Sequence, residues 1–310
     1  MGHGKKVSLK ATLQSQQTRL KAEKKAEHAA QVAEQKGKRK TQNTKGKSNP
    51  PTIPFRPIDT ILLIGEGNFS FARALLVDPP DELEHLPPAG VTATSYDSEE
   101  DCYAKYSDAR KIVETLRSRG AEVVFGVDAA KLHKHSSFKG RRWDRIVWNF
   151  PHAGKGITDQ DRNILSNQRL ILDFLRSASH CLSLGPIPLV HQKRPRKVPD
   201  DDDEDMNVED PEDLLPSTAV GSGRGTILIT LRNVPPYTTW DVPRLAKTPP
   251  KSSRTGETPN PRFKLLRSFV FHRSIWKGYE HRMTKGERAH GQGTTGVGGE
   301  DRTWEFCLQD

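Results

Sequence analysis

The middle of the chain alternates short apolar runs with longer stretches whose apolar residues recur every three or four positions. The first pattern predicts buried β-strands and the second predicts amphipathic helices. Strands are expected at 61–64, 91–96, 121–125, 145–148, 226–231, 265–271 and 303–308, and helices at 69–76, 99–118, 164–182 and 240–246. Gly120 and Gly185 are expected to end the second and third helices. Four strand–helix alternations predict an α/β fold with a mainly parallel sheet and helices on both faces.

Polar residues follow each of the first four predicted strands, where sheets of this kind bind their ligands. The loop after the first strand contains Gly65, Glu66, Gly67, Asn68 and Phe69. Glycine lets a backbone approach a ligand closely, and the helix that follows offers unpaired N–H groups. The loop therefore predicts a cofactor site, with a simple tight turn as the alternative. A dinucleotide motif would require a third glycine where this chain has Ser70.

Two aspartates follow the next two strands. Asp97 would accept hydrogen bonds from both ribose hydroxyls of an adenosine-containing ligand, or it would cap the helix that begins near Ser98. Asp128 would bind an adenine amino group, or it would only cap its loop.

The fourth strand ends in the sequence WNFPH, residues 148–152. Asn149 presents one acceptor and two donors to a planar, amide-like target. Phe150 is suited to stacking on a base, and Pro151 stiffens the loop. A purely structural proline turn is the alternative interpretation.

Charge divides the chain into parts. Residues 1–50 hold thirteen Lys/Arg against three Asp/Glu, so they account for the whole net charge of +10. We expect a mostly disordered tail that binds RNA and directs nuclear import through 36–40, rather than only a solubilising arm. Residues 48–57 contain four prolines and are expected to be a linker. An acidic stretch at about 186–224, with ten acidic and five basic residues, is expected to be a disordered insertion in a folded domain spanning 51–310.

Composition excludes several classes of protein. No apolar run approaches the roughly 20 residues that span a bilayer, and no apolar stretch follows the lysine-rich start. Three widely spaced cysteines have no metal-ligand spacing and suit a reducing, intracellular compartment. We therefore expect no metal, no membrane association and a monomer.

The order of these motifs resembles a Rossmann-like methyltransferase that uses S-adenosylmethionine. In such enzymes the fourth strand ends in a substrate-facing Asn/Asp-Pro-Pro-aromatic motif, from which NFPH departs at Phe150 and His152. The chain is more closely similar to the eukaryotic large-subunit (25S) rRNA uridine-N3 methyltransferases (BMT5-like). The matching stretches are ILLIGEGNFSFARAL (61–75), TATSYDSEEDCYAKY (92–106), WNFPHAGKG (148–156), NQRLILDFLRSA (167–178), GTILITLRNVPPYTTWDVPRLA (225–246) and GYEHRMT (278–284).

This resemblance implies a seven-stranded sheet with a C-terminal antiparallel strand, S-adenosylmethionine as the cofactor, and a uridine of large-subunit rRNA or a pre-ribosomal particle as the substrate. It also implies a nucleolar location within the nucleus. The predicted catalytic residues are Asn149, Phe150, Pro151 and His152, of which His152 is a general base, a partner of the uracil or a loop cap. An inactive ribosome-assembly factor and a dinucleotide-dependent oxidoreductase are the alternative functions.

Overall fold

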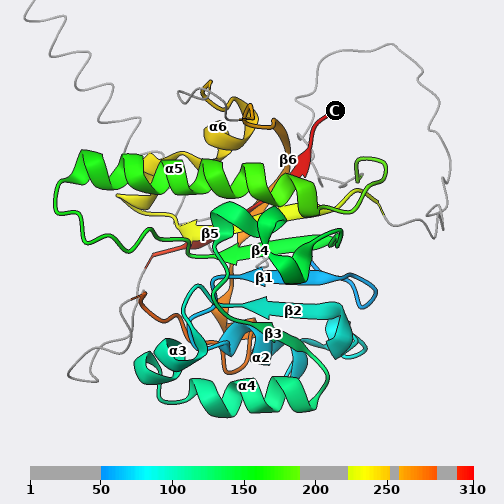
Figure 1. Cartoon of the computed structure of the whole chain (residues 1–310). Helices are drawn as coiled ribbons and strands as arrows, with labels where there is room; N and C mark the ends of the chain where they lie inside the picture. Colours follow the sequence, from blue (N-terminus) through cyan, green and yellow to red (C-terminus); the bar gives the residue numbers. More distant parts are fainter. Residues whose placement is uncertain (1–49, 189–222, 252–257, 285–298) are drawn as a thin grey trace, which may run out of the picture. The chain divides into compact units, whose positions relative to one another are not determined.

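Seven strands form one sheet in the order β3-β2-β1-β4-β5-β7-β6 in the computed structural model, which describes residues 50–188, 223–251, 258–284 and 299–310 (Figure 1). The strands are β1 (Ile61–Ile64), β2 (Val91–Thr94), β3 (Glu122–Val124), β4 (Arg145–Asn149), β5 (Thr226–Arg232), β6 (Phe263–Val270) and β7 (Asp301–Leu308). Strands β1 to β5 pair in parallel, whereas β7 is antiparallel to both β5 and β6. The predicted α/β fold with a mostly parallel seven-stranded sheet is confirmed.

Side chains of alternate residues along the strands pack on opposite faces of the sheet, as the two-residue period of a strand requires. Leu63 and Val147 face the helices α2 and α4, while Leu62 and Ile146 face α5 and α6. These helices span Ser70–Leu76 (α2), Ala109–Ser118 (α4), Gln160–Ala178 (α5) and Val242–Lys247 (α6). Both faces of the central strands are buried, which explains why these strands are apolar throughout.

The predicted helix over 99–118 is wrong in one respect, because the chain forms two helices there, α3 (Glu99–Lys105) and α4. Tyr106 between them is extended and only 2% exposed. Its hydroxyl donates to the carbonyl oxygen of Met283 at 2.8 Å. The helix is interrupted because this ring is buried beneath a segment 177 residues away in the sequence, a contact that helical periodicity does not reveal.

The end of the long helix also differs from the prediction. Helix α5 stops at Ala178 and continues as a 3₁₀ turn to Cys181, well before Gly185. The next residue, Leu182, pairs with Trp143 in a parallel bridge, and the N–H of Trp143 donates to the carbonyl oxygen of Cys181 at 2.8 Å. Pairing with the start of the β4 region therefore ends the helix, and the glycine is not needed as its cap.

The proline-rich segment predicted as a linker is partly core. Phe55 is 6% exposed, and its ring lies 6.5 Å from that of Phe71 and 5.9 Å from that of Trp276. Burial of one such aromatic side chain stabilises a fold by about 3 kcal/mol or less on the transfer scale. Residues 51–57 therefore belong to the folded unit, which extends over Pro51–Asp310.

The predictions for the basic tail and for most of the acidic insertion lie outside the described residues. The described ends of the insertion lie side by side, because the N–H of Arg224 donates to the carbonyl oxygen of Pro186 at 2.8 Å. Within the described ranges, no helix combines the length and apolarity needed to cross a membrane.

Candidate active site

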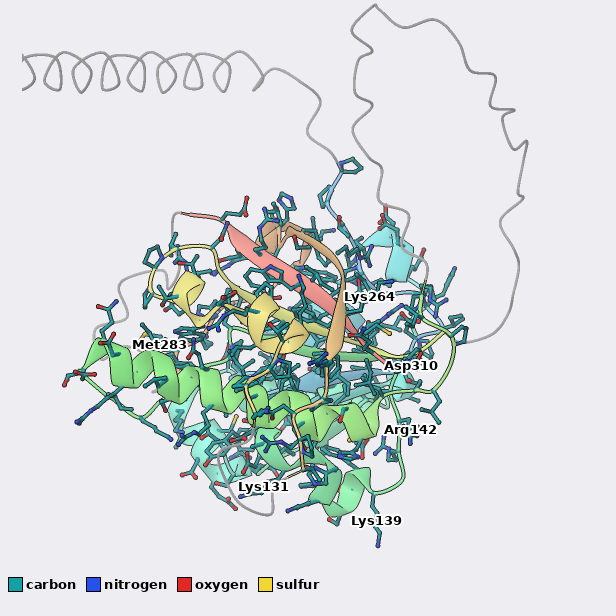
Figure 2. The ribbon with its side chains drawn as sticks, turned by 90° about the horizontal axis from the view of Figure 1, so that it is seen from above. Lys131, Lys139, Arg142, Lys264, Met283 and Asp310 are labelled. Atoms are coloured by element: carbon teal, nitrogen blue, oxygen red, sulfur yellow. The ribbon has the colours of Figure 1, made fainter. Side chains whose placement is uncertain are left out.

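The strand order brings four predicted loops to one edge of the sheet. Strands β3, β2, β1 and β4 are neighbours, and the chain order changes direction between β1 and β4. Parallel sheets bind ligands at such a switch point, outside the carboxyl ends of the strands. Figure 2 shows Met283 at this end and Arg142, Lys264 and Asp310 at the opposite end.

Gly65 is held where no side chain fits without strain. Its φ is +65°, and a Cβ atom built on it would lie 3.0 Å from Nε1 of Trp148. Its neighbour Glu66 donates its N–H to the carbonyl oxygen of Thr94 at 2.8 Å. The loop is thus fixed against the ends of β4 and β2, with the exposed Gly65 backbone open to a ligand.

Two of the predicted cofactor-loop residues point inward. Phe69 is fully buried at φ +62° and packs edge-on against Phe125, with 5.3 Å between ring centroids. Asn68 donates from Nδ2 to Asp108 at 2.9 Å and accepts the N–H of Ser70 at 3.2 Å. These side chains shape the loop from within, and a role for them in cofactor binding stays a prediction.

Glu66 points back toward the start of α2. Its Oε2 accepts the N–H of Ala72 at 3.2 Å. Burial raises the pKa of Glu66 to about 7, although backbone hydrogen bonds from Ala72 and Phe71 lower it. This carboxyl group therefore changes its protonation state near neutral pH.

The structure separates the two interpretations of Asp97. Ser98, and not Asp97, caps α3 by accepting the N–H of Asp101 at 3.1 Å. Asp97 instead binds Lys105, with 2.5 Å between Oδ1 and Nζ, and its side chain remains 18% exposed. Asp97 is therefore not a helix cap, and a ribose bound there would share its carboxylate with Lys105.

Asp128 behaves as the loop cap that was its alternative interpretation. Its Oδ1 accepts the N–H of Ala130 at 2.9 Å in the 3₁₀ turn Ala129–Lys134, and its Oδ2 lies 3.1 Å from Nζ of Lys131. An adenine amino group would have to compete with an exposed lysine for this carboxylate.

Phe150 adopts a backbone conformation that is uncommon for a non-glycine residue, with φ +53°. Its N–H donates to the carbonyl oxygen of Thr230 at 2.8 Å. The ring of His281 lies 4.3 Å from its ring, and the guanidinium of Arg273 lies 5.0 Å from its centroid. His281 and Arg273 therefore contact the ring that was predicted to stack on a base, while the residue remains partly exposed.

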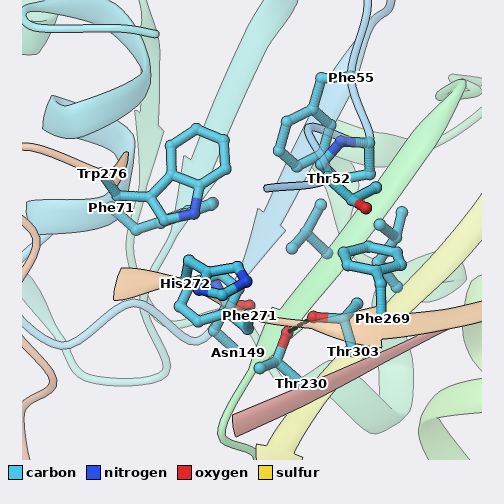
Figure 3. Close-up of a pocket in the computed structure, with 13 residues that line it drawn as sticks. Thr52, Phe55, Phe71, Asn149, Thr230, Phe269, Phe271, His272, Trp276 and Thr303 are labelled. Carbon is cyan, nitrogen blue, oxygen red and sulfur yellow. Dashed lines mark hydrogen bonds between the residues drawn. The ribbon is translucent and has the colours of Figure 1, made fainter. Parts of the chain in front are cut away.

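Asn149 lines a small pocket on the α2 face of the sheet (Figure 3). Its Oδ1 is buried and makes no hydrogen bond to the described residues. Figure 3 shows it on the same side as the hydroxyls of Thr230 and Thr303, which share a 2.8 Å hydrogen bond, below the rings of Phe55 and Trp276. A buried carbonyl without a partner costs about 1–3 kcal/mol, so this oxygen calls for an explanation, and a hydrogen bond to a ligand is one.

His152 is constrained by its own loop. Pro151 before it is buried, and Nδ1 of His152 accepts the N–H of Gly154 at 2.9 Å. Partial desolvation lowers the pKa of His152, although the residue as a whole reaches solvent. The ring is therefore neutral at pH 7, with its proton on Nε2, which makes it a donor on its exposed side.

A C-terminal segment, Tyr279 to Thr284, packs against the loops after β1 and β4, although sequence patterns predict no role for it. Ser70 Oγ exchanges hydrogen bonds with Glu280, donating to its carbonyl oxygen at 3.0 Å and accepting its N–H at 3.1 Å. A Cβ atom on Gly67 would lie 3.2 Å from Arg282, and one on Gly154 would lie 3.2 Å from Thr284. The segment thus connects the loop after β1 with the loop after β4. Its only sequence signal is the matching stretch GYEHRMT.

Comparison with known proteins identifies the family. Residues 62–283 match the family described as rRNA (uridine-N3-)-methyltransferase BTM5-like. The chain belongs to this family. It is therefore a methyltransferase, as the sequence resemblance predicted.

Individual relatives of this family member differ in how much they share with it. The 25S rRNA (uridine(2634)-N(3))-methyltransferase of Saccharomyces cerevisiae is 30% identical over 263 residues, covering 76% of this chain and 69% of that protein. Heavy metal-associated isoprenylated plant protein 41 of Arabidopsis thaliana is 35% identical over 136 residues, 43% of this chain but 25% of that protein. An rRNA methylase structure from Streptococcus thermophilus is 10% identical with a TM-score of 0.33, covering 84% of this methyltransferase and all of that chain.

Proposed function

We propose that this methyltransferase transfers the methyl group of S-adenosylmethionine to N3 of a uridine in large-subunit rRNA, and that it acts in the nucleolus during ribosome biogenesis. The observation that carries the proposal is the convergence of the polar strand ends at the β1/β4 switch point. Membership of the rRNA methyltransferase family supplies the reaction class.

The residues at this edge suit S-adenosylmethionine. Gly65 presents exposed backbone, and Asp97 offers a carboxylate at the next strand end for the ribose hydroxyls. When bound, the cofactor supplies an electrophilic methyl group on a sulfonium. Among the described residues, no group of three or more His, Cys, Asp or Glu side chains is arranged to hold a metal ion.

Two side chains of this protein are suited to form hydrogen bonds with the uracil. N3 carries a weakly acidic proton between two carbonyls, and negative charge develops on those oxygens as the proton leaves. Asn149 lies at the end of β4 and is suited to donate an amide N–H to one of them. Nε2–H of His152 is suited to donate to the substrate, because Nδ1 is already bound to Gly154. This geometry supports the partner interpretation of His152 over the general base.

The uridine must leave any base pair before it reacts, because N3 lies on its pairing edge. We therefore expect an unpaired or flipped uridine at the loop formed by residues 148–156. The cost of flipping is a few kcal/mol and is smallest for a base that is already unpaired.

The decisive test is mass spectrometry of nucleosides from large-subunit rRNA after deletion of the gene. We expect 3-methyluridine to fall and to return when the wild-type chain is restored. Unchanged 3-methyluridine would refute the substrate assignment. Calorimetry with S-adenosylmethionine then distinguishes the enzyme from an inactive assembly factor, which would give no binding heat.

A further inference from the structure

His281 lies beside the loop after β4, the loop in which the sequence predicts a role for His152. Its ring lies 4.3 Å from that of Phe150, the residue after Asn149, at an interplanar angle of 54°. The following residues anchor the segment, because Arg282 binds Asp108 at 3.2 Å and the carbonyl oxygen of Met283 accepts the Tyr106 hydroxyl. His281 is thus held between the cofactor loop and the end of β4.

Both ring nitrogens of His281 are available to a ligand. Within the described part of the chain, neither nitrogen makes a hydrogen bond. His152 differs, because the N–H of Gly154 occupies its Nδ1. Of the two histidines beside this loop, only His281 can therefore both accept and donate without rearrangement.

The surroundings hold His281 neutral. Burial, together with the smaller effect of the positive charges on Arg273 and Arg232, lowers the pKa of His281 to about 4. Asp301 balances part of this charge, since it lies 2.6 Å from Arg273 and 3.9 Å from Arg232. Charged groups close to this segment in the described part of the chain also include Glu66, which acts on Tyr279, and the paired Glu280 and Arg282.

We propose that His281 contacts the pairing edge of the target uracil and contributes to the choice of uracil over cytosine. A neutral imidazole can accept the N3–H of uracil, whereas an imidazolium has only donors and would suit the unprotonated N3 of cytosine. Burial keeps His281 neutral, with a smaller contribution from the two arginines, and a neutral ring favours the base that carries a proton on N3. This inference rests on the proposed uridine methylation and names a substrate contact within it.

Three substitutions separate a contact with the base from simple packing. His281→Phe retains a ring against Phe150 but removes both nitrogens, and we expect kcat/KM for a uridine-containing rRNA fragment to fall about 10- to 100-fold, as loss of a substrate hydrogen bond implies. His281→Asn restores an acceptor and a donor and should recover part of the loss. His85→Phe, in an exposed loop between α2 and β2, is the control and should leave the rate unchanged.

A second measurement uses pH. Wild-type kcat/KM should show no loss from His281 between pH 5.5 and 8, because its pKa of about 4 lies below that window. Arg273→Met removes one of the charges that lower this pKa, so the acidic limb should move upward, while burial still holds it below the ordinary histidine value near 6.5. A packing role would not move this limb.

The results distinguish the two proposals. If the wild-type enzyme forms no 3-methyluridine, the proposed function fails. If it does, and His281→Phe keeps near-wild-type kcat/KM with an unshifted acidic limb in Arg273→Met, the inference about His281 is wrong. Thermal midpoints and S-adenosylmethionine affinity of His281→Phe and His85→Phe should stay at wild-type values, so that a loss of kcat/KM reports the substrate contact.

Discussion

At the scale of single residues, His152 shows how one main-chain N–H limits a side chain's chemistry. Nδ1 of His152 accepts the N–H of Gly154 at 2.9 Å, so Nε2 is the ring nitrogen that can donate. We expect His152→Asn to keep this turn, because an Asn side chain also accepts a local N–H. The value of kcat/KM should fall less than about 10-fold, mostly because KM rises, and its pH profile should not change. A drop of the 10²–10⁴-fold typical of a lost general base, with a residual rate that climbs with pH, would instead make His152 the base.

Asn149 is the second residue whose role can be measured. Its Oδ1 is buried without a hydrogen-bond partner among the described residues, so the side chain is not required to satisfy the fold. Asn149→Ala should lower kcat about 10²-fold, as loss of one donor to a developing negative charge does, and should leave S-adenosylmethionine affinity unchanged. Thr303 lines the same pocket, and Thr303→Val is the control that measures how a change in the pocket wall alone affects the rate. Near-wild-type turnover in Asn149→Ala would mean that WNFPH is only a structural turn.

Glu66 predicts how stability depends on pH. Its folded pKa of about 7 lies above the ordinary value of 4.5, so its contribution to stability is complete below pH 4.5 and is lost as the pH rises through 7. Glu66→Gln imitates the protonated form at every pH. The thermal midpoint of this variant, relative to wild type without cofactor, should therefore increase between pH 5 and pH 8. A constant difference would show that Glu66 is ionised throughout, and the exposed Glu84→Gln variant serves as the control.

At the scale of elements, segment 279–284 connects parts of the chain that carry separate motifs. It contacts the loop after β1 through Ser70, the junction of α3 and α4 through Tyr106, and the loop after β4 through Phe150. The interruption between α3 and α4 therefore helps to position segment 279–284 against these two loops. A continuous helix over 99–118 would not place Tyr106 beneath Met283.

The acidic insertion is an element that the fold is expected not to need. Its described ends meet at Pro186 and Arg224, and the N–H of Gly225 donates to the carbonyl oxygen of Ser183 at 2.8 Å. We expect replacement of residues 189–222 by a short Gly-Ser linker to change the thermal midpoint by less than about 3 °C, which corresponds to about 1 kcal/mol in a domain of this size. A Gly-Ser segment of the original length controls for loop closure. A larger loss in both variants would mean that the insertion packs on the folded unit.

At the scale of the whole molecule, the excess positive charge and the predicted site lie in different parts of the chain. The thirteen Lys/Arg of the tail lie within residues 1–47, while the predicted site residues all lie between 65 and 152. Basic side chains that bind phosphates release counterions, so RNA affinity falls with salt in proportion to their number. Removal of residues 1–47 should therefore flatten the salt dependence of RNA binding and leave S-adenosylmethionine affinity intact. An unchanged slope would show that the tail only solubilises the protein.

The sequence by itself determined the strands, their polar ends and the family. Apolar runs such as 61–64 and 226–231 are local, and the loops that follow them reach one edge in any parallel sheet. The predicted positions of Gly65, Asp97 and Asn149 at this edge required no knowledge of distant contacts. The ordered matching stretches then named the family.

Only the tertiary structure decided how the side chains at that edge are used. Phe69 is buried, Asp128 caps its turn, and the ring of His281 packs against that of Phe150. These outcomes depend on pairs that are remote in sequence, such as Tyr106 with Met283, 177 residues apart, and Ser70 with Glu280, 210 residues apart. Periodicity and motif spacing report neighbours along the chain, whereas the protonation and availability of a histidine are set by groups that only folding brings together.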